Sequence, residues 1–111
     1  MALPTDPKAR KRIPIASGVV RYFPDALIAV AEVSYLGNEQ HNPGEPLHWS
    51  REKSNDHEDC LMRHIVDKDW AKAAWRALAI LQLAEEQKHR TSNEATPYHI
   101  VKHSMPAGSY G

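Results

Sequence analysis

The chain has 111 residues and carries 14 basic and 14 acidic side chains, so its formal net charge is zero. This length fits one domain, and a hydrophobic content of 41% is enough for a globular core. Balanced charge argues against a general nucleic-acid partner, and no apolar run approaches the roughly 18 residues that cross a bilayer. The single cysteine excludes an intrachain disulfide, and we expect a cytoplasmic protein without a membrane partner.

The first predicted helix follows an N-terminal arm, residues 1–22. The arm is polar and rich in proline at its start, so we expect it to be loosely ordered, with a short extended piece or a turn over residues 13–22. Pro24 and Asp25 are typical of a helix start, where a missing N–H costs nothing and a carboxylate meets the positive end of the dipole. Apolar periodicity carries this helix to Gln40.

Turn chemistry predicts a loop over residues 41–49, which contain Asn42-Pro43-Gly44 and Glu45-Pro46. A second helix follows, with Ser54 or Asn55 as its cap, and ends near Val66.

The third predicted helix covers residues 70–88, with Asp69 as its cap. Its apolar stripe is wide, which predicts burial on more than one side of the helix. Residues 89–111 lose the period and are predicted to form an irregular tail. The sequence therefore predicts an all-α fold, a small helical bundle over residues 23–88 whose core is completed by oligomerisation.

Four carboxylates have a spacing that brings them together in pairs. Glu32 and Glu39 are seven residues apart on the first helix, and Asp56 and Asp59 are three apart on the second. If the two helices packed antiparallel, all four would converge, and converging carboxylates repel each other unless a cation lies between them. Mg²⁺ or Mn²⁺ would suit such oxygen ligands. Acidic pairs on solvated helix faces are also commonplace, and that reading stays open.

Groups that suit a phosphate and a base lie close by in the sequence. Lys53, Arg63 and His64 flank or face the second-helix carboxylates, and Arg76 lies on the third predicted helix. Arginine matches phosphate oxygens with a planar fork. Trp49 follows the predicted loop and could stack on a base. Surface ion pairs for the cations and a loop anchor for Trp49 are the alternatives.

Several segments resemble phage-encoded dATP/dGTP diphosphohydrolases, a branch of the MazG-like all-helical nucleotide pyrophosphohydrolases. The resemblance runs from Tyr22 to Leu83, a little over half the chain. The matching segments are Phe23-Pro24-Asp25-Ala26, Ala31-Glu32-Val33, the run from Gly37 to Trp49, Asp56-His57, Arg63-His64 and the run from Ala74 to Ala79.

The resemblance implies a helical dimer or tetramer that binds Mg²⁺ or Mn²⁺ and hydrolyses a deoxynucleoside triphosphate to monophosphate and pyrophosphate. Glu32 matches the family's first-helix glutamate, and Asp59 matches the aspartate four residues before its Arg-His pair. Glu39 and Asp56 match a narrower phage subgroup. The chain departs from the broader pattern at Tyr35, where that pattern has a second glutamate, and its segment between the Arg-His pair and the last helix is shortened to residues 65–72.

The working hypothesis is a metal-dependent nucleoside triphosphate pyrophosphohydrolase acting on a purine such as dGTP or dATP, in an infected host cell if the chain is phage-encoded. This hypothesis gives each predicted site residue a role. The metal ligands are Glu32, Glu39, Asp56 and Asp59; the catalytic groups are Glu32, Glu39 and Asp59; the substrate contacts are Asn38, Trp49, Lys53, Arg63, His64 and Arg76. The shortened segment and Tyr35 favour an alternative, a non-catalytic protein that sequesters nucleotides, for example signalling nucleotides of host defence.

Overall fold

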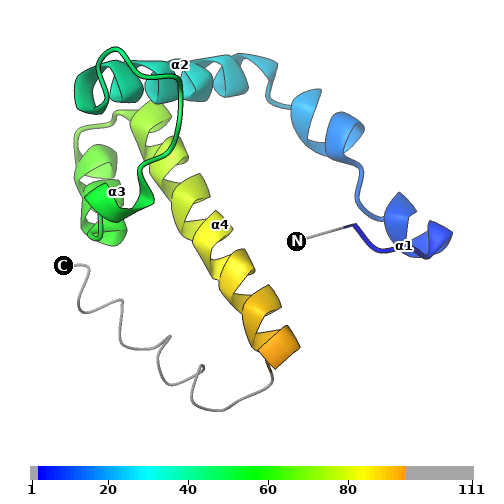
Figure 1. Cartoon of the computed structure of the whole chain (residues 1–111). Coiled ribbons are helices and arrows are strands. Elements are labelled where there is room, and N and C mark those ends of the chain that lie inside the picture. The colour runs from blue at the N-terminus through cyan, green and yellow to red at the C-terminus, as the bar shows by residue number, and fades with distance from the viewer. Residues whose placement is uncertain (1–2, 95–111) are drawn as a thin grey trace.

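The computed structural model describes residues 3–94, with side chains through residue 90, and this part of the chain is all-helical, as predicted. The elements in chain order are α1 (Pro7–Lys11), one π-helical turn η1 (Ala16–Val20), α2 (Pro24–His41), a 3-10 turn η2 (Arg51–Lys53), α3 (His57–Val66) and α4 (Trp70–Glu94). Figure 1 shows α2 crossing the N-terminal end of α4, with α3 beside α4 and the N-terminal segment reaching away from the other helices.

The N-terminal segment is helical in two short pieces, so the expectation of a loosely ordered or extended arm is wrong for Pro7–Lys11 and Ala16–Val20. The backbone N–H of Ala9 donates to the Asp6 carboxylate at 3.0 Å, and proline occupies the first helical position. This pair of signals at residues 6 and 7 starts α1, because the carboxylate satisfies a free N–H and proline loses no hydrogen bond there.

Helix α3 begins at His57 with Asp56 at the cap position, one to two residues later than the predicted cap, and residues 51–53 form a separate 3-10 turn before it. Its end has the hydrogen bonds of a Schellman motif. The N–H of Asp69 donates to His64 O at 2.9 Å, and the N–H of Lys68 donates to Ile65 O at 3.0 Å. Lys68 consequently has φ +58°, a left-handed conformation usually taken by glycine.

Helix α4 starts where the sequence predicts it, since the N–H of Lys72 donates to the Asp69 carboxylate at 3.2 Å. It continues to Glu94, past the predicted end at residue 88. The sequence did not predict this extension, because its residues are polar and have no apolar period. Such residues are nevertheless compatible with an exposed helix. The remainder of the predicted tail, residues 95–111, lies outside the described residues.

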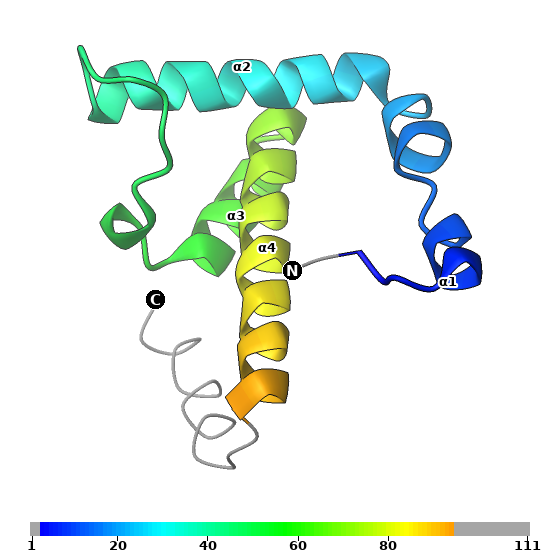
Figure 2. The ribbon, with the colours of Figure 1, turned by 45° about the vertical axis from the view of Figure 1, so that its right-hand side comes forward.

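The helices are organised around α4, which packs extensively against both α3 and α2 (Figures 1 and 2). Within the described residues, the only apolar side chains that are buried belong to Ala73 and Ala79, and no large side chain is fully buried. No single described helix is long and apolar enough to cross a membrane. The pair Pro7–Val20 and Pro24–His41, bent by 82°, passes that test of length and composition together.

Replacing Lys68 with glycine is expected to raise the free energy of unfolding by about 1 kcal/mol, because a left-handed conformation costs an L-residue roughly that much. Urea denaturation followed by circular dichroism measures the change. Lys68→Ala is the matched control, since it removes the same side chain and keeps the Cβ. Equal stability of the glycine and alanine variants would contradict the left-handed assignment.

Candidate functional site

A cleft of about 760 Å³ lies between α2, the loop that follows it, and α4. Its described lining consists of Val33, Ser34, Gly37, Asn38, His41, Asn42, Leu47, His48, Trp49, Ser50, Lys53, Ser54, Trp75 and Arg76. Cavities of roughly 300–1,000 Å³ accommodate ordinary small-molecule ligands. The lining combines two indole rings, two amides and two permanent cations, and contains no carboxylate among these residues.

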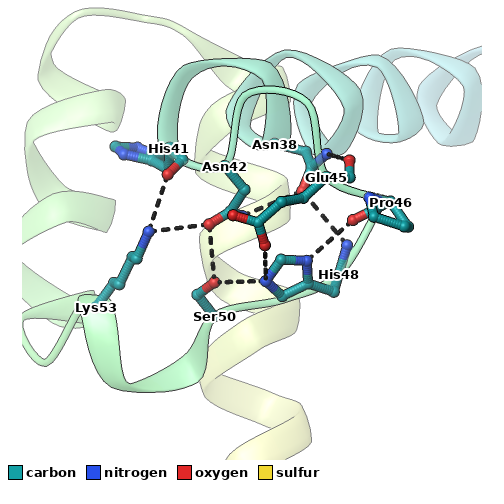
Figure 3. Close-up of polar contacts among 8 residues, drawn as sticks. All are labelled: Asn38, His41, Asn42, Glu45, Pro46, His48, Ser50 and Lys53. Atoms are coloured by element: carbon teal, nitrogen blue, oxygen red, sulfur yellow. Dashed lines mark hydrogen bonds and ion pairs between the residues drawn. The ribbon is translucent and has the colours of Figure 1, made fainter.

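Two buried asparagines hold the loop that forms one wall of the cleft (Figure 3). Asn38 Nδ2 donates to the carbonyl of Glu45 at 3.0 Å, and Asn38 Oδ1 accepts from Asn42 Nδ2 at 3.1 Å. The backbone N–H of His48 also donates to Asn38 Oδ1, at 3.4 Å. The amide of Asn38 is thus engaged by the loop, and its predicted contact with a ligand stays a prediction. The geometry gives it a positioning role.

Lys53 lies at the edge of this hydrogen-bond network. Its hydrogen bonds within the described residues go to neutral oxygens. Its Nζ donates to His41 O and to Asn42 Oδ1, both at 2.9 Å (Figure 3). Ser50 Oγ lies 3.3 Å from the same Asn42 oxygen and 3.1 Å from His48 Nε2. Asn42 therefore connects the loop and Lys53 to the C-terminal end of α2.

The two indole rings of the cleft are fixed by contacts that reach across the fold. Trp75 Nε1 donates to Ser34 Oγ at 2.7 Å, which joins α4 to α2. Trp49 meets Trp75 edge to face, with ring centroids 5.7 Å apart. The Arg51 guanidinium lies 4.3 Å from the Trp49 centroid and is held by Glu86 on α4, Nη1 to Oε1, at 2.6 Å. The Arg51 hydrogen bond lowers the pKa of Glu86 to about 2, with a smaller effect from Gln82.

Arg76 is the second cation of the cleft, and its hydrogen bonds also go to neutral groups. Its Nη1 donates to Ser54 Oγ at 3.0 Å and to His57 Nδ1 at 2.9 Å. Because a guanidinium only donates, His57 Nδ1 must be the acceptor, so the ring is neutral with its proton on Nε2. Burial, and then the Arg76 charge, lower the pKa of His57, against an opposing effect of Asp56. Arg76 Nε is buried and has no partner among the described residues.

The described lining of the cleft contains two positive side chains and no negative one. None of the described ion pairs involves Lys53 or Arg76, and the one at the cleft lining joins His48 Nε2 to Glu45 Oε1 at 3.8 Å. Each exposed cation could be screened by water and salt, but Arg76 is half-buried, where charges interact more strongly. A buried donor without a partner costs about 1–3 kcal/mol, so the Nε of Arg76 is a local source of instability among the described residues. Lys53 and Arg76 therefore give the described lining of the cleft an excess of positive charge.

The four predicted metal ligands lie outside this cleft. Ser34, Asn38 and His41 line it from α2, and at 100° per residue Glu32 and Glu39 fall on the opposite side of that helix. Both glutamates are exposed and have no hydrogen bond or ion pair with another described residue. The condition for convergence is not met in one chain, because α2 and α3 each pack on α4 rather than extensively on each other.

On α3, Asp56 and Asp59 have different environments. Asp56 accepts from Cys60 Sγ at 3.5 Å, Ser54 Oγ at 3.3 Å and Arg63 Nη2 at 3.4 Å. These bonds, that of Cys60 first, lower the pKa of Asp56. Asp59 is exposed and borders a separate hollow of about 350 Å³.

In the described part of the chain, no group of three or more His, Cys, Asp or Glu side chains is placed to hold one metal ion. The carboxylates of a single chain therefore do not fit one common metal site.

The structure brings together four predicted ligand contacts, Asn38, Trp49, Lys53 and Arg76, in one cleft. Arg63 instead lies against Asp56, and His64 is half-buried on α3 away from the cleft lining. The sequence reasoning missed Trp75 as a cleft residue. Its signal was present, since Trp75 directly precedes Arg76, but its contact with Ser34 joins residues 41 positions apart.

Comparisons of the chain with protein families, with curated proteins and with solved structures find no match.

The free energy of unfolding is expected to decrease as the pH is lowered below about 6.5, the ordinary pKa of histidine. The pKa of His57 is lower in the folded chain than in the unfolded chain. On acidification the unfolded chain therefore takes up this proton first, which favours unfolding. The stabilisation is present above pH 6.5 and is lost as the pH falls through the window below it. Urea denaturation at pH 5.0 to 7.5 measures this slope.

His57→Asn keeps an acceptor for Arg76 and removes the titrating ring, so the variant should show a shallower slope in that window. A slope identical to that of the unmodified protein would show that other groups cause the dependence. His89→Asn is the matched control, because His89 is exposed on α4.

Proposed function

We propose that this protein binds a nucleoside triphosphate in the cleft between α2 and α4, with the phosphates at Lys53 and Arg76. The observation that carries the proposal is the pairing of these two cations with neutral partners only, in a cleft whose described lining has no carboxylate. A polyanion would neutralise both charges through charge-assisted hydrogen bonds from the ammonium and the guanidinium.

The aromatic wall supports a ligand that also carries a flat ring. Trp49 and Trp75 line the same cleft as the cations, and stacking of a nucleobase on an aromatic side chain is worth about 1–3 kcal/mol. Arg51 covers part of Trp49, and its link to Glu86 holds the ring in place. A purine has the larger stacking surface of the two base classes, which favours dGTP or dATP as the ligand.

We propose further that the bound triphosphate is hydrolysed to monophosphate and pyrophosphate, in an oligomer and in the cytoplasm where these nucleotides are found. The resemblance to MazG-like enzymes and the unpaired carboxylates Glu32, Glu39 and Asp59 support this step. One chain does not gather these carboxylates at the cleft, so Mg²⁺ or Mn²⁺ would need ligands from more than one copy. The scarcity of buried apolar side chains supports a homodimer or homotetramer.

A second candidate is a sequestering protein that holds the nucleotide intact. The specific observation in its favour is that Lys53 and Arg76 supply positive charge to the cleft directly, so phosphate binding there does not need a metal ion. Binding in the presence of a chelator, without product formation, distinguishes this candidate from the enzyme.

Lys53→Gln and Arg76→Gln are each expected to weaken dGTP binding at least about tenfold, because each removes a charge-assisted bond to phosphate. Isothermal titration calorimetry measures the affinity, with and without Mg²⁺. Lys72→Gln is the matched control, since Lys72 is an exposed cation on α4 outside the cleft. Circular dichroism checks that each variant is folded. Equal affinities for all three variants would contradict the placement of the phosphates.

Glu32→Gln and Asp59→Asn are each expected to abolish Mg²⁺- or Mn²⁺-dependent release of pyrophosphate from dGTP, because a neutral amide is a poor ligand for a hard cation. Ion-exchange chromatography of the products measures turnover. Glu58→Gln, an exposed neighbour of Asp59, is the control and should retain activity. Unchanged turnover in both variants would reject these carboxylates as metal ligands. No turnover in the unmodified protein, with dGTP binding retained, would favour the sequestering protein.

A further inference from the structure

The loop between α2 and the turn η2 brings a hydroxyl, an imidazole and a carbonyl together at the cleft (Figure 3). Ser50 Oγ lies 3.1 Å from His48 Nε2, and His48 Nδ1 lies 2.9 Å from the carbonyl oxygen of Pro46. Because a carbonyl oxygen only accepts, Nδ1 carries a proton, and Nε2 of the neutral ring is a free acceptor. The hydroxyl proton of Ser50 is therefore directed at His48 Nε2.

Asn42 Oδ1 is the other acceptor near this hydroxyl, and it is the weaker competitor for the proton. It lies 3.3 Å from Ser50 Oγ, farther than His48 Nε2, and it already accepts from Lys53 Nζ at 2.9 Å. The shared oxygen places the Lys53 ammonium next to the Ser50 hydroxyl. A cation in this position stabilises negative charge that develops on the serine oxygen or on a phosphate bound beside it.

A hydroxyl within hydrogen-bond reach of a base, with the base oriented by a third group, is the arrangement of an activated nucleophile. Here Ser50 is the hydroxyl, His48 is the base, and the Pro46 carbonyl orients the ring. When His48 takes a proton at Nε2, the Glu45 carboxylate, 3.8 Å from that nitrogen, offsets the new charge. The described lining of the cleft thus supplies its own base, whereas the predicted catalytic carboxylates lie outside it.

We propose that Ser50 attacks the α-phosphorus of the bound triphosphate and forms a covalent nucleotidyl-serine, with His48 as the general base. The Oγ–P bond forms, the bond from the α-phosphorus to its bridging oxygen breaks, and pyrophosphate leaves. His48 Nε2 takes the hydroxyl proton and passes it to the departing pyrophosphate. In the second step His48 takes a proton from water, the water oxygen attacks the same phosphorus, and the Oγ–P bond breaks. The proton then returns to Ser50, and the monophosphate is released.

The order of residues along the loop favours the α-phosphorus over the terminal one. Trp49, the proposed contact of the base, directly precedes Ser50, and both residues line the cleft. The α-phosphate is the phosphate nearest to the base in any nucleoside triphosphate, so stacking on Trp49 brings this phosphate closest to Ser50. This step rests on the proposed function and concerns only which group attacks, so a metal ion bound to the phosphates is compatible with it.

The stereochemistry at the α-phosphorus tests the covalent step without any substitution. One diastereomer of dGTP with sulfur on its α-phosphorus is hydrolysed in water enriched in a heavy oxygen isotope. Phosphorus NMR, after stereospecific rephosphorylation, gives the configuration of the product. Two successive displacements should retain the configuration. Inversion would show direct attack by water and overturn the covalent step while leaving the proposed function in place. No turnover would contradict the proposed hydrolysis and the covalent step together.

Ser50→Ala is expected to abolish release of pyrophosphate from dGTP while calorimetry still detects dGTP binding, because Lys53 and Arg76 remain. His48→Ala should slow the release about a hundredfold or more, since a positioned general base contributes at least that much. Ser17→Ala, which removes an exposed hydroxyl outside the cleft, is the matched control and should retain activity. Circular dichroism checks that each variant is folded. Undiminished turnover in folded Ser50→Ala would overturn the role of the hydroxyl.

Discussion

The proposed function depends on two cations, Lys53 and Arg76, that share a cleft whose described lining contains no carboxylate. Lys53 and Arg76 reach the cleft from different elements, and each finds only neutral acceptors there. Neutral His57 accepts from Arg76, so the imidazole orients the guanidinium without neutralising it. The excess positive charge is tolerable because the cleft is open to water, and an anionic ligand would replace that water with direct contacts.

Buried and half-buried polar side chains fix the walls of the cleft relative to one another. The buried amides of Asn38 and Asn42 attach the loop to α2, and the Trp75–Ser34 hydrogen bond attaches α4 to the same helix. Few apolar side chains are buried among the described residues. These polar contacts therefore do much to hold the loop, α2 and α4 together in this region. The proposed assembly with further copies would add the apolar burial that the described part of one chain lacks.

The sequence predicted the helices whose start signals are local, such as Pro24 for α2 and Asp69 for α4. It failed for the N-terminal segment, where Asp6 and Pro7 were such a signal and were overlooked. Residue type alone identified Asn38, Trp49, Lys53 and Arg76 as candidate ligand contacts. Helix spacing could not decide that Glu32 and Glu39 face away from the cleft. That outcome depends on α2 packing against α4, a long-range contact that no local pattern encodes.

Indole NMR resonances test the central claim most directly, because the chain has three tryptophans and the cleft contains two of them. Addition of dGTP in the presence of a chelator should shift the indole N–H signals of Trp49 and Trp75 and leave in place that of Trp70, an exposed side chain at the start of α4 outside the cleft lining. A spectrum in which neither cleft indole moves at saturating nucleotide would contradict a nucleotide site in this cleft.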